Sequence, residues 1–288
     1  MVDLSFDRVS RVSQVSPRTK RSLKSTAHVY GYASIRLLCL ALALASGHAM
    51  AAPLDESAER YRPYMVEGIG QALNGARDLK KRIAESDLAG ARKAWLSARA
   101  GWERSEVFTA GFVPELDQKI DAWPDSTTGF HAIEAKLFGS GQLDVGNEAD
   151  ALVGNLDDLH SKLPAMELKP QGLLDGLVRL AYEVGESKAD GGESRISGTS
   201  LDDMRNNVSG IDFAYRTIFS DALETSDRKL ADRIDGKIKS LSDVLDVREL
   251  RAVNIPKLRE VSEDLVVSLQ AAAPKLGLGR PTLEASTR

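Results

Sequence analysis

The sequence predicts an all-α protein, an up-and-down helical bundle in which two four-helix-type bundles pack end to end. From Asp55 onward, apolar residues recur at spacings of three and four, which is the period of an amphipathic helix. No stretch alternates between apolar and polar residues for long enough to indicate a strand. Proline and glycine residues divide the pattern into segments suited to packing side by side.

The helical pattern divides at recognisable helix-start and turn signals. Ser86-Asp87 is typical of a helix start, and prolines mark several connections. The polar segment Asp190–Thr199 is the best candidate for a hinge between two halves of a helical domain spanning 52–276, and 277–288 is expected to be a flexible tail. Helices are expected near residues 56–85, 88–111, 128–139, 147–162, 170–188, 200–223, 227–246 and 255–272.

Residues 1–51 have the organisation of a secretory signal peptide. Basic residues up to Arg36 precede the apolar run Leu37–Ala45, and the small-x-small triplet Ala49-Met50-Ala51 follows. The run is shorter than the roughly 20 residues that span a bilayer. We therefore expect a soluble, exported, periplasmic protein, and the long region before the run suggests a true start codon downstream of Met1. A lipid anchor is not expected at Cys39, because leucines rather than small residues precede it.

The composition excludes several classes of function. Residues 1–51 hold seven Lys or Arg and two acids, so the remaining chain carries a net charge near −9. Such acidity argues against nucleic acid as a partner, because phosphate binding needs a basic face. Cys39 is the one cysteine of the chain, which excludes disulfides and thiolate metal sites from everything after it.

The second expected helix places carboxylates on its apolar side. Trp95, Trp102 and Thr109 define the apolar stripe. Glu106 lies four residues after Trp102 and three before Thr109, and therefore falls on that stripe. Glu103 is three residues before Glu106, so the two carboxylates are expected to be neighbours on one side of the helix.

The helix expected near 128–139 shows the same anomaly. Phe130, Ile133 and Leu137 form its apolar side, and Glu134 stands four residues after Phe130 and three before Leu137. His131 lies three residues before Glu134, so imidazole and carboxylate should project side by side.

The segment between these helices adds Asp117 and Asp121. An unpaired buried carboxylate is costly, and several together raise one another's pKa. A bound metal ion would supply the missing positive charge. The alternative is that each acid faces solvent or pairs with a nearby cation such as Arg99, Arg104 or Lys136.

The candidate ligands suit iron or manganese, because several carboxylates and one imidazole without sulfur form a hard-to-borderline set. Zinc and copper are also compatible. Neither the His-Glu-x-x-His pattern of zinc proteases nor the paired Glu-x-x-His pattern of di-iron bundles is present. After the leader the histidines are His131 and His160, the latter expected on a helix surface. With no phosphate loop or nucleophile motif either, binding is favoured over catalysis.

The stretch Ala94–Gly139 resembles the imelysin family, and within it the EfeO-type members of bacterial iron-uptake systems. The resemblance is carried by W-E-R-S-E from Trp102, L-D-Q-K-I-D-A-W-P from Leu116 and G-F-H-A-I-E-A-K-L-F-G from Gly129. It implies a two-bundle helical fold, binding of Fe²⁺ or Fe³⁺, and service to a membrane iron permease. Asp117 matches a further acid of the family. The metal ligands implied by the resemblance are Glu103, Glu106, Asp121, His131 and Glu134.

Other functions remain open from the sequence. The chain shows no cupredoxin-like domain, so oxidation of iron before transport would require a separate periplasmic oxidase. An acidic polysaccharide such as alginate is an alternative ligand, with Arg195, Arg205 and Arg216 as candidate contacts. A metallopeptidase using Glu106 or Glu134 as general base is a further alternative.

Overall fold

The computed structural model of the chain describes residues 52–122 and 127–283, and within these ranges the secondary structure is helical with no strand. The predicted all-α fold is confirmed. None of the helices in these ranges is long and apolar enough to cross a membrane. The predicted signal peptide, 1–51, lies outside the described residues.

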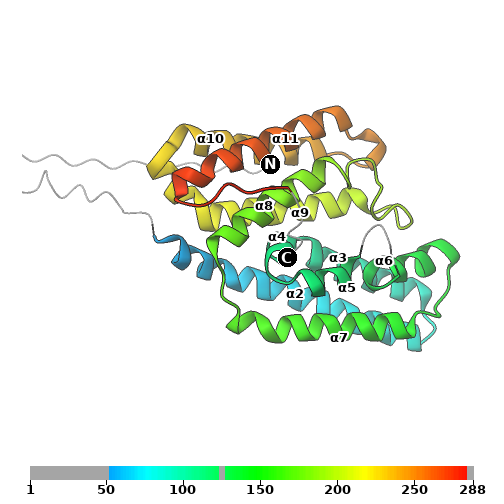
Figure 1. Cartoon of the computed structure of the whole chain (residues 1–288). Helices are drawn as coiled ribbons and strands as arrows, with labels where there is room; N and C mark the ends of the chain where they lie inside the picture. The colour runs from blue at the N-terminus through cyan, green and yellow to red at the C-terminus, as the bar shows by residue number, and fades with distance from the viewer. Residues whose placement is uncertain (1–51, 123–126, 284–288) are drawn as a thin grey trace, which may run out of the picture. The chain divides into compact units, whose positions relative to one another are not determined.

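The first group of helices surrounds the long helix α2 (Leu54–Ala84). α2 packs along α3 (Leu88–Glu103) and α7 (Gly146–Lys162), which lie beside it in Figure 1. The short helices α5 (Pro114–Asp121) and α6 (Gly129–Glu134) contact each other and α7.

The second group comprises the later helices α8 (Pro170–Gly185), α9 (Ser200–Ala214), α10 (Ser220–Leu245) and α11 (Ile255–Ala272) (Figure 1). α8 and α10 each pack against both α9 and α11. α3 contacts α9, and the short helix α4 (Glu106–Phe112) contacts both α8 and α9, so α3 and α4 connect the two groups. The predicted hinge at 190–199 between the groups stays a prediction.

The expected helix 88–111 is interrupted. Arg104 and Ser105 form a turn between α3 and α4. The Ser105 hydroxyl donates to the Gly101 carbonyl oxygen at 2.9 Å, a side-chain bond that competes with helical hydrogen bonds. A connection was expected at Pro114, but this residue begins α5 instead, because proline is well suited to the first helical turn.

Later boundaries also differ from those expected. The predicted break between 223 and 227 appears as a kink at Asp227, whose φ of −157° is not helical and whose carboxylate accepts from the Leu230 amide at 3.2 Å. π-helical turns follow α6 at Ala135–Ser140 and α9 at Tyr215–Phe219. Single 3₁₀ turns complete the fold at Leu163–Ala165, Leu250–Ala252 and Ala273–Leu276.

The expected tail is held to the helices over its first residues. Gln171 of α8 exchanges two hydrogen bonds with the Gly279 backbone, at 2.7 and 3.1 Å. Residues 284–288 lie outside the described part of the chain, and flexibility of the tail stays a prediction.

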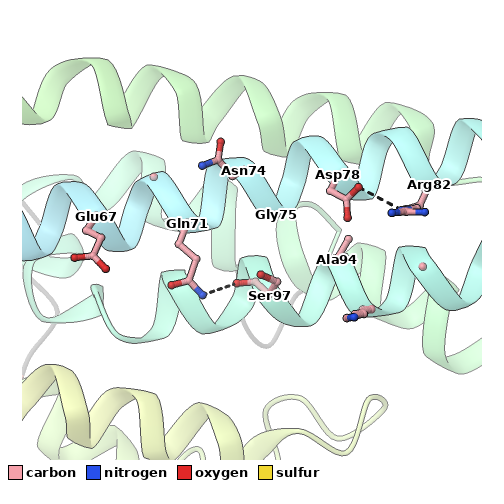
Figure 2. Close-up of a pocket in the computed structure, with 11 residues that line it drawn as sticks. Glu67, Gln71, Asn74, Gly75, Asp78, Arg82, Ala94 and Ser97 are labelled. Atoms are coloured by element: carbon pink, nitrogen blue, oxygen red, sulfur yellow. Dashed lines mark hydrogen bonds and ion pairs between the residues drawn. The ribbon is translucent and has the colours of Figure 1, made fainter.

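An open groove of about 920 Å³ runs between α2 and α3 (Figure 2). Two polar pairs lie within the groove: Asp78 pairs with Arg82 at 3.3 Å, and Gln71 donates to the Ser97 carbonyl oxygen at 3.3 Å. None of the sequence-predicted ligands lines it. The chemistry expected from the sequence therefore lies elsewhere in the molecule.

Candidate metal centre

The buried face of α3 carries charge as well as aromatic rings. Trp95, Arg99, Trp102 and Glu103 follow one another at helical spacing and are all buried. The side chains of Arg99 and Glu103 are 1% and 0% exposed, and Arg99 Nη2 lies 2.5 Å from Glu103 Oε1. Ionised groups this deep require partners, since an unpaired buried charge costs several kcal/mol.

Glu103 and Glu106 are brought together by Asn207 of α9. Its side-chain amide donates to Glu103 Oε2 at 2.7 Å and to Glu106 Oε2 at 2.8 Å. One turn later, a Cβ on Gly210 would lie 2.4 Å from the Arg104 carbonyl oxygen, closer than a side chain tolerates. Glycine at this position therefore lets α9 approach the end of α3 closely enough for Asn207 to bridge the two carboxylates.

Asp121 ends α5 at the same place. Its Oδ2 accepts from Trp102 Nε1 at 2.7 Å, while its Oδ1 contacts the Arg99 guanidinium and lies 3.2 Å from His131 Nε2. Gly129 permits the approach of α6: its φ is +66°, and a Cβ there would lie 2.1 Å from the Ile120 carbonyl oxygen.

His131 and Glu134 interact as their spacing predicted. His131 Nδ1 lies 2.9 Å from Glu134 Oε2, and both side chains are buried. Glu134 Oε1 accepts from both the backbone amide and the hydroxyl of Ser197, each at 2.7 Å. A carboxylate on one imidazole nitrogen fixes the ring and leaves the other nitrogen directed at the cluster, as in many metal sites. The π turn directly after Glu134 is of a kind often found at functional sites.

The segment between α8 and α9 contributes residues that the sequence analysis missed. Glu193 Oε1 lies 2.7 Å from Arg99 Nη2 and 3.6 Å from His131 Nε2. Asp203 Oδ2 accepts from the Ser194 hydroxyl at 2.5 Å. Glu193 lies in the polar, glycine-containing segment expected to be a hinge, where nothing in the sequence distinguishes a buried glutamate from a solvated one.

Asp121, His131 and Glu193 offer a set of three ligand atoms. One carboxylate oxygen of Asp121, one ring nitrogen of His131 and one carboxylate oxygen of Glu193 all lie within 4.8 Å of one another. Two metal–ligand bonds of about 2.1 Å at right angles separate the ligand atoms by about 3 Å. The 3.2 Å between Asp121 Oδ1 and His131 Nε2 matches this spacing, and an ion held by the pair would replace the contact between them and the contact of Oδ1 with Arg99.

Protein cations occupy the same cluster. Lys188 Nζ lies 2.6 Å from Glu103 Oε2, 3.1 Å from Glu106 Oε2 and 3.5 Å from Glu193 Oε1. Among the cations suggested by the sequence, Arg99 pairs with the cluster. The other two pair with different acids: Arg104 with Glu67 at 3.0 Å and Lys136 with Glu148 at 3.0 Å.

Carboxylates still outnumber cations, and the protonation of the cluster reflects this. Burial and Arg99 favour neutral imidazole, but the contacts to three carboxylates prevail and raise the pKa of His131 to about 10. Burial, reinforced by Glu103, raises the pKa of Asp203 to about 7 and that of Glu106 well above its ordinary value. Burial opposes ionisation of Glu193, but Lys188 and His131 lower its pKa to about 2. The cluster therefore holds protons that an incoming cation can replace.

Asp117, the less certain predicted ligand, lies apart from His131. It lines a cavity of about 10 Å³ with Glu106, Thr109, Arg179 and Glu183. Burial raises the pKa of Asp117 to about 7. The structure thus gathers Glu103, Glu106, Asp121, His131 and Glu134 in one cluster and places Asp117 beside Glu106 at its edge.

Two of the three arginines considered for polysaccharide binding pair with acids close to them. Arg205 pairs with Asp202 at 3.1 Å, and Arg216 pairs with Asp212 and Asp235 at 2.7 and 3.2 Å.

Comparison with known proteins gives a consistent assignment. The Imelysin family model matches residues 58–128 and 125–272. An Efem/EfeO family lipoprotein of Staphylococcus aureus (strain MRSA252) is 32% identical over 206 residues, which cover 68% of this chain and 72% of that protein. A protein of the same description from strain MSSA476 is 31% identical with the same coverage.

A solved structure agrees in fold. The "putative iron-regulated protein A precursor" of Parabacteroides distasonis superposes with a TM-score of 0.63 over 80% of this chain and 97% of that one, at 16% sequence identity. The matched family model, the identity to the Efem/EfeO proteins and the helical fold together show that this chain belongs to the imelysin family and is EfeO-like.

Proposed function

We propose that this protein captures a metal ion, iron foremost, at the cluster around His131 and delivers it to a membrane iron permease. The observation that carries the proposal is the convergence of Asp121, His131 and Glu193 within 4.8 Å. Glu103, Glu106 and Glu134 surround them and supply further oxygen atoms and negative charge.

The donor set favours iron over softer metals. Carboxylate oxygens with one imidazole and no sulfur suit Fe²⁺, Fe³⁺ or Mn²⁺, although divalent affinities in general rise toward copper, so zinc and copper also compete. Ligation requires neutral imidazole, and the pKa of His131 near 10 means that the ion must displace a proton from it. Capture should therefore release protons and weaken as the pH falls.

The proposal also includes export of the chain and a membrane permease as its partner. The signal-like residues 1–51 and the lipoprotein description of the Staphylococcus relatives support export. We infer that this chain works in the periplasm, where a separate oxidase would serve the same system if iron must change oxidation state before transport.

Binding is better supported than catalysis. Of the two carboxylates considered as general bases, Glu134 accepts on both oxygens, from His131 and from Ser197, while Glu106 accepts from Lys188 and Asn207 on Oε2. A general base needs an oxygen free to take a proton from water within hydrogen-bond reach.

The test is metal titration of chelator-stripped protein, with Fe²⁺ under anaerobic conditions and with Fe³⁺, Mn²⁺, Zn²⁺ and Cu²⁺ separately. His131→Ala should abolish stoichiometric binding of the preferred metal, while His160→Ala, which removes the histidine on α7, should leave it intact. Equal binding by wild type and His131→Ala would reject the site.

A further inference from the structure

We propose that Lys188 is a built-in counter-ion of the cluster and that its ammonium is displaced when the metal binds. In this role Lys188 sets the affinity of the site. The inference rests on the proposed function and concerns the regulation of that same cluster.

The surroundings of Lys188 are those of a bound cation. Its side chain is 1% exposed, and its ammonium contacts carboxylates from three elements: Glu103 at the end of α3, Glu106 at the start of α4, and Glu193 in the segment before α9. Three carboxylates within 3.5 Å of one buried ammonium form the kind of oxygen-lined environment that stabilises a cation. The positive charge of Arg99 repels the Lys188 ammonium, and the carboxylate of Glu183 attracts it.

A metal bound by Asp121, His131 and Glu193 would share one carboxylate oxygen with the Lys188 ammonium. Glu193 Oε1 contacts Lys188 and also lies 3.6 Å from His131 Nε2. An ion held by His131 and Glu193 would therefore sit within a few ångströms of Nζ, where two like charges repel strongly at low dielectric. Occupation of the site by both cations is disfavoured, and the lysine must yield.

Lys188 is better suited to yield than Arg99. Arg99 projects from the middle of α3 and contacts acids on several sides, which fixes its guanidinium. Lys188 follows the end of α8 in a turn, and a lysine ammonium is a compact charge on a flexible stem. Movement of the lysine side chain alone would remove one of the two donors on Oε2 of Glu103 and of Glu106, and would leave Asn207 as the other.

Lys188 explains how Glu103, Glu106 and Glu193 can stay buried when no metal is bound, because its ammonium pairs with all three. Removing one partner of a buried ion pair strongly destabilises a protein. Lys188 offsets part of the negative charge of the cluster, and the metal must replace this cation, which lowers the affinity for the metal. Reversible capture is what a delivery protein requires.

The experiment compares wild type, Lys188→Met and Lys188→Gln at one fixed pH of 8, so that competition from protons is measured under the same conditions for each protein. Lys162→Met, on the exposed surface of α7 where Lys162 pairs with Asp158, is the matched control. Removing the ammonium should tighten metal binding about tenfold or more, by analogy with the effect of a neighbouring charge on a carboxylate pKa. The metal-free Lys188 variants should unfold at lower urea, and metal should raise their melting temperature by more than it raises that of wild type.

If wild type binds metal and the folded Lys188 variants bind it equally or more weakly, the counter-ion role of Lys188 is refuted. The proposed metal-binding function would not be affected by that result. Absence of binding in both wild type and Lys188→Met would instead refute the proposed function and this inference with it.

Wild type provides a second measurement that does not depend on folding of the variants. Amine-reactive labelling, quantified by mass spectrometry of the peptide containing Lys188, should be slow without metal and faster with it, while Lys162 labels equally in both states. Equal labelling of Lys188 in both states would contradict displacement.

Discussion

Gly129 shows how a single residue without a side chain positions the functional histidine. The left-handed φ of Gly129 and its contact with the Ile120 carbonyl bring the start of α6 against the end of α5, and so His131 against Asp121. This geometry could not be deduced from the sequence motif, where the glycine resembles any helix-start residue.

Gly129→Ala should therefore destabilise the protein by about 2 kcal/mol, since a non-glycine residue in such a conformation costs about 1–3 kcal/mol. The same change should weaken metal binding, because α6 must shift away from Ile120. Gly154→Ala on α7, where no atom lies within 4 Å of the added Cβ, should instead stabilise by roughly 0.5–1 kcal/mol. Urea unfolding of the three proteins checks both effects, and equal stability of Gly129→Ala and wild type would refute the steric argument.

Asp117 predicts a dependence of stability on pH. Burial raises its pKa from 3.8 to about 7 in the folded state, so folded protein binds more protons than unfolded protein between these values. Stability from this group is present at low pH and is lost as the pH rises through 7. The substitution Asp117→Asn should remove this loss of stability at higher pH.

Metal-free Asp117→Asn should thus be more stable than wild type at pH 8 by about 2 kcal/mol, roughly half the full linkage value because the side chain is partly solvated. The difference should vanish near pH 3.8. Urea unfolding at several pH values measures it, and a constant difference across the range would show that the carboxyl does not titrate as described.

At the scale of elements, the cluster depends on side chains that connect one helix to the next. Trp102 of α3 donates its indole hydrogen at 2.7 Å to Oδ2 of Asp121, at the end of α5. The other oxygen of this carboxylate, Oδ1, faces His131. Such outer contacts orient a ligand, and their loss typically costs metal affinity 10–100-fold.

Trp102→Phe should keep the ring packing of α3 but release Asp121. We expect the free energy of unfolding to fall by roughly 2 kcal/mol, through the lost hydrogen bond to a charged acceptor and the smaller ring. Metal affinity should fall by about tenfold or more. Calorimetric titration with the preferred metal measures the affinity, and an unchanged affinity would show that Arg99 alone orients Asp121.

The sequence predicted the elements better than the contacts among them. Apolar periodicity identified the long helices, and the positions of Glu106 and Glu134 on apolar stripes indicated buried acids, with Glu103 and His131 expected beside them. Local spacing could not predict Glu193, Asp203 or Asn207, because their burial arises only when α9 and the segment before it pack against α3 and α4. The break at Ser105 was also missed, because a hydroxyl bond to a carbonyl is not visible as a pattern.

At the scale of the whole molecule, the cluster lies where the two groups of helices meet. Its residues come from α3 to α6, from the segment after α8, and from α9, so both groups contribute to it. An ion bound there would connect parts of the chain that are otherwise held together by ion pairs and apolar contacts. Because the unfolded chain scatters these ligands, binding to the folded state must add to global stability.

Metal loading should therefore raise the melting temperature of the wild-type protein. At free metal about 100 times the Kd, linkage adds about 2.7 kcal/mol, which corresponds to roughly 5–10 °C for a domain of this size. Chelation with EDTA should reverse the shift, and His131→Ala should show none because the imidazole links Asp121 to Glu134. Differential scanning calorimetry with and without metal measures the effect. A melting temperature unaffected by metal in the wild type would mean that the acids around His131 are neutralised by Arg99, Lys188 and protons alone.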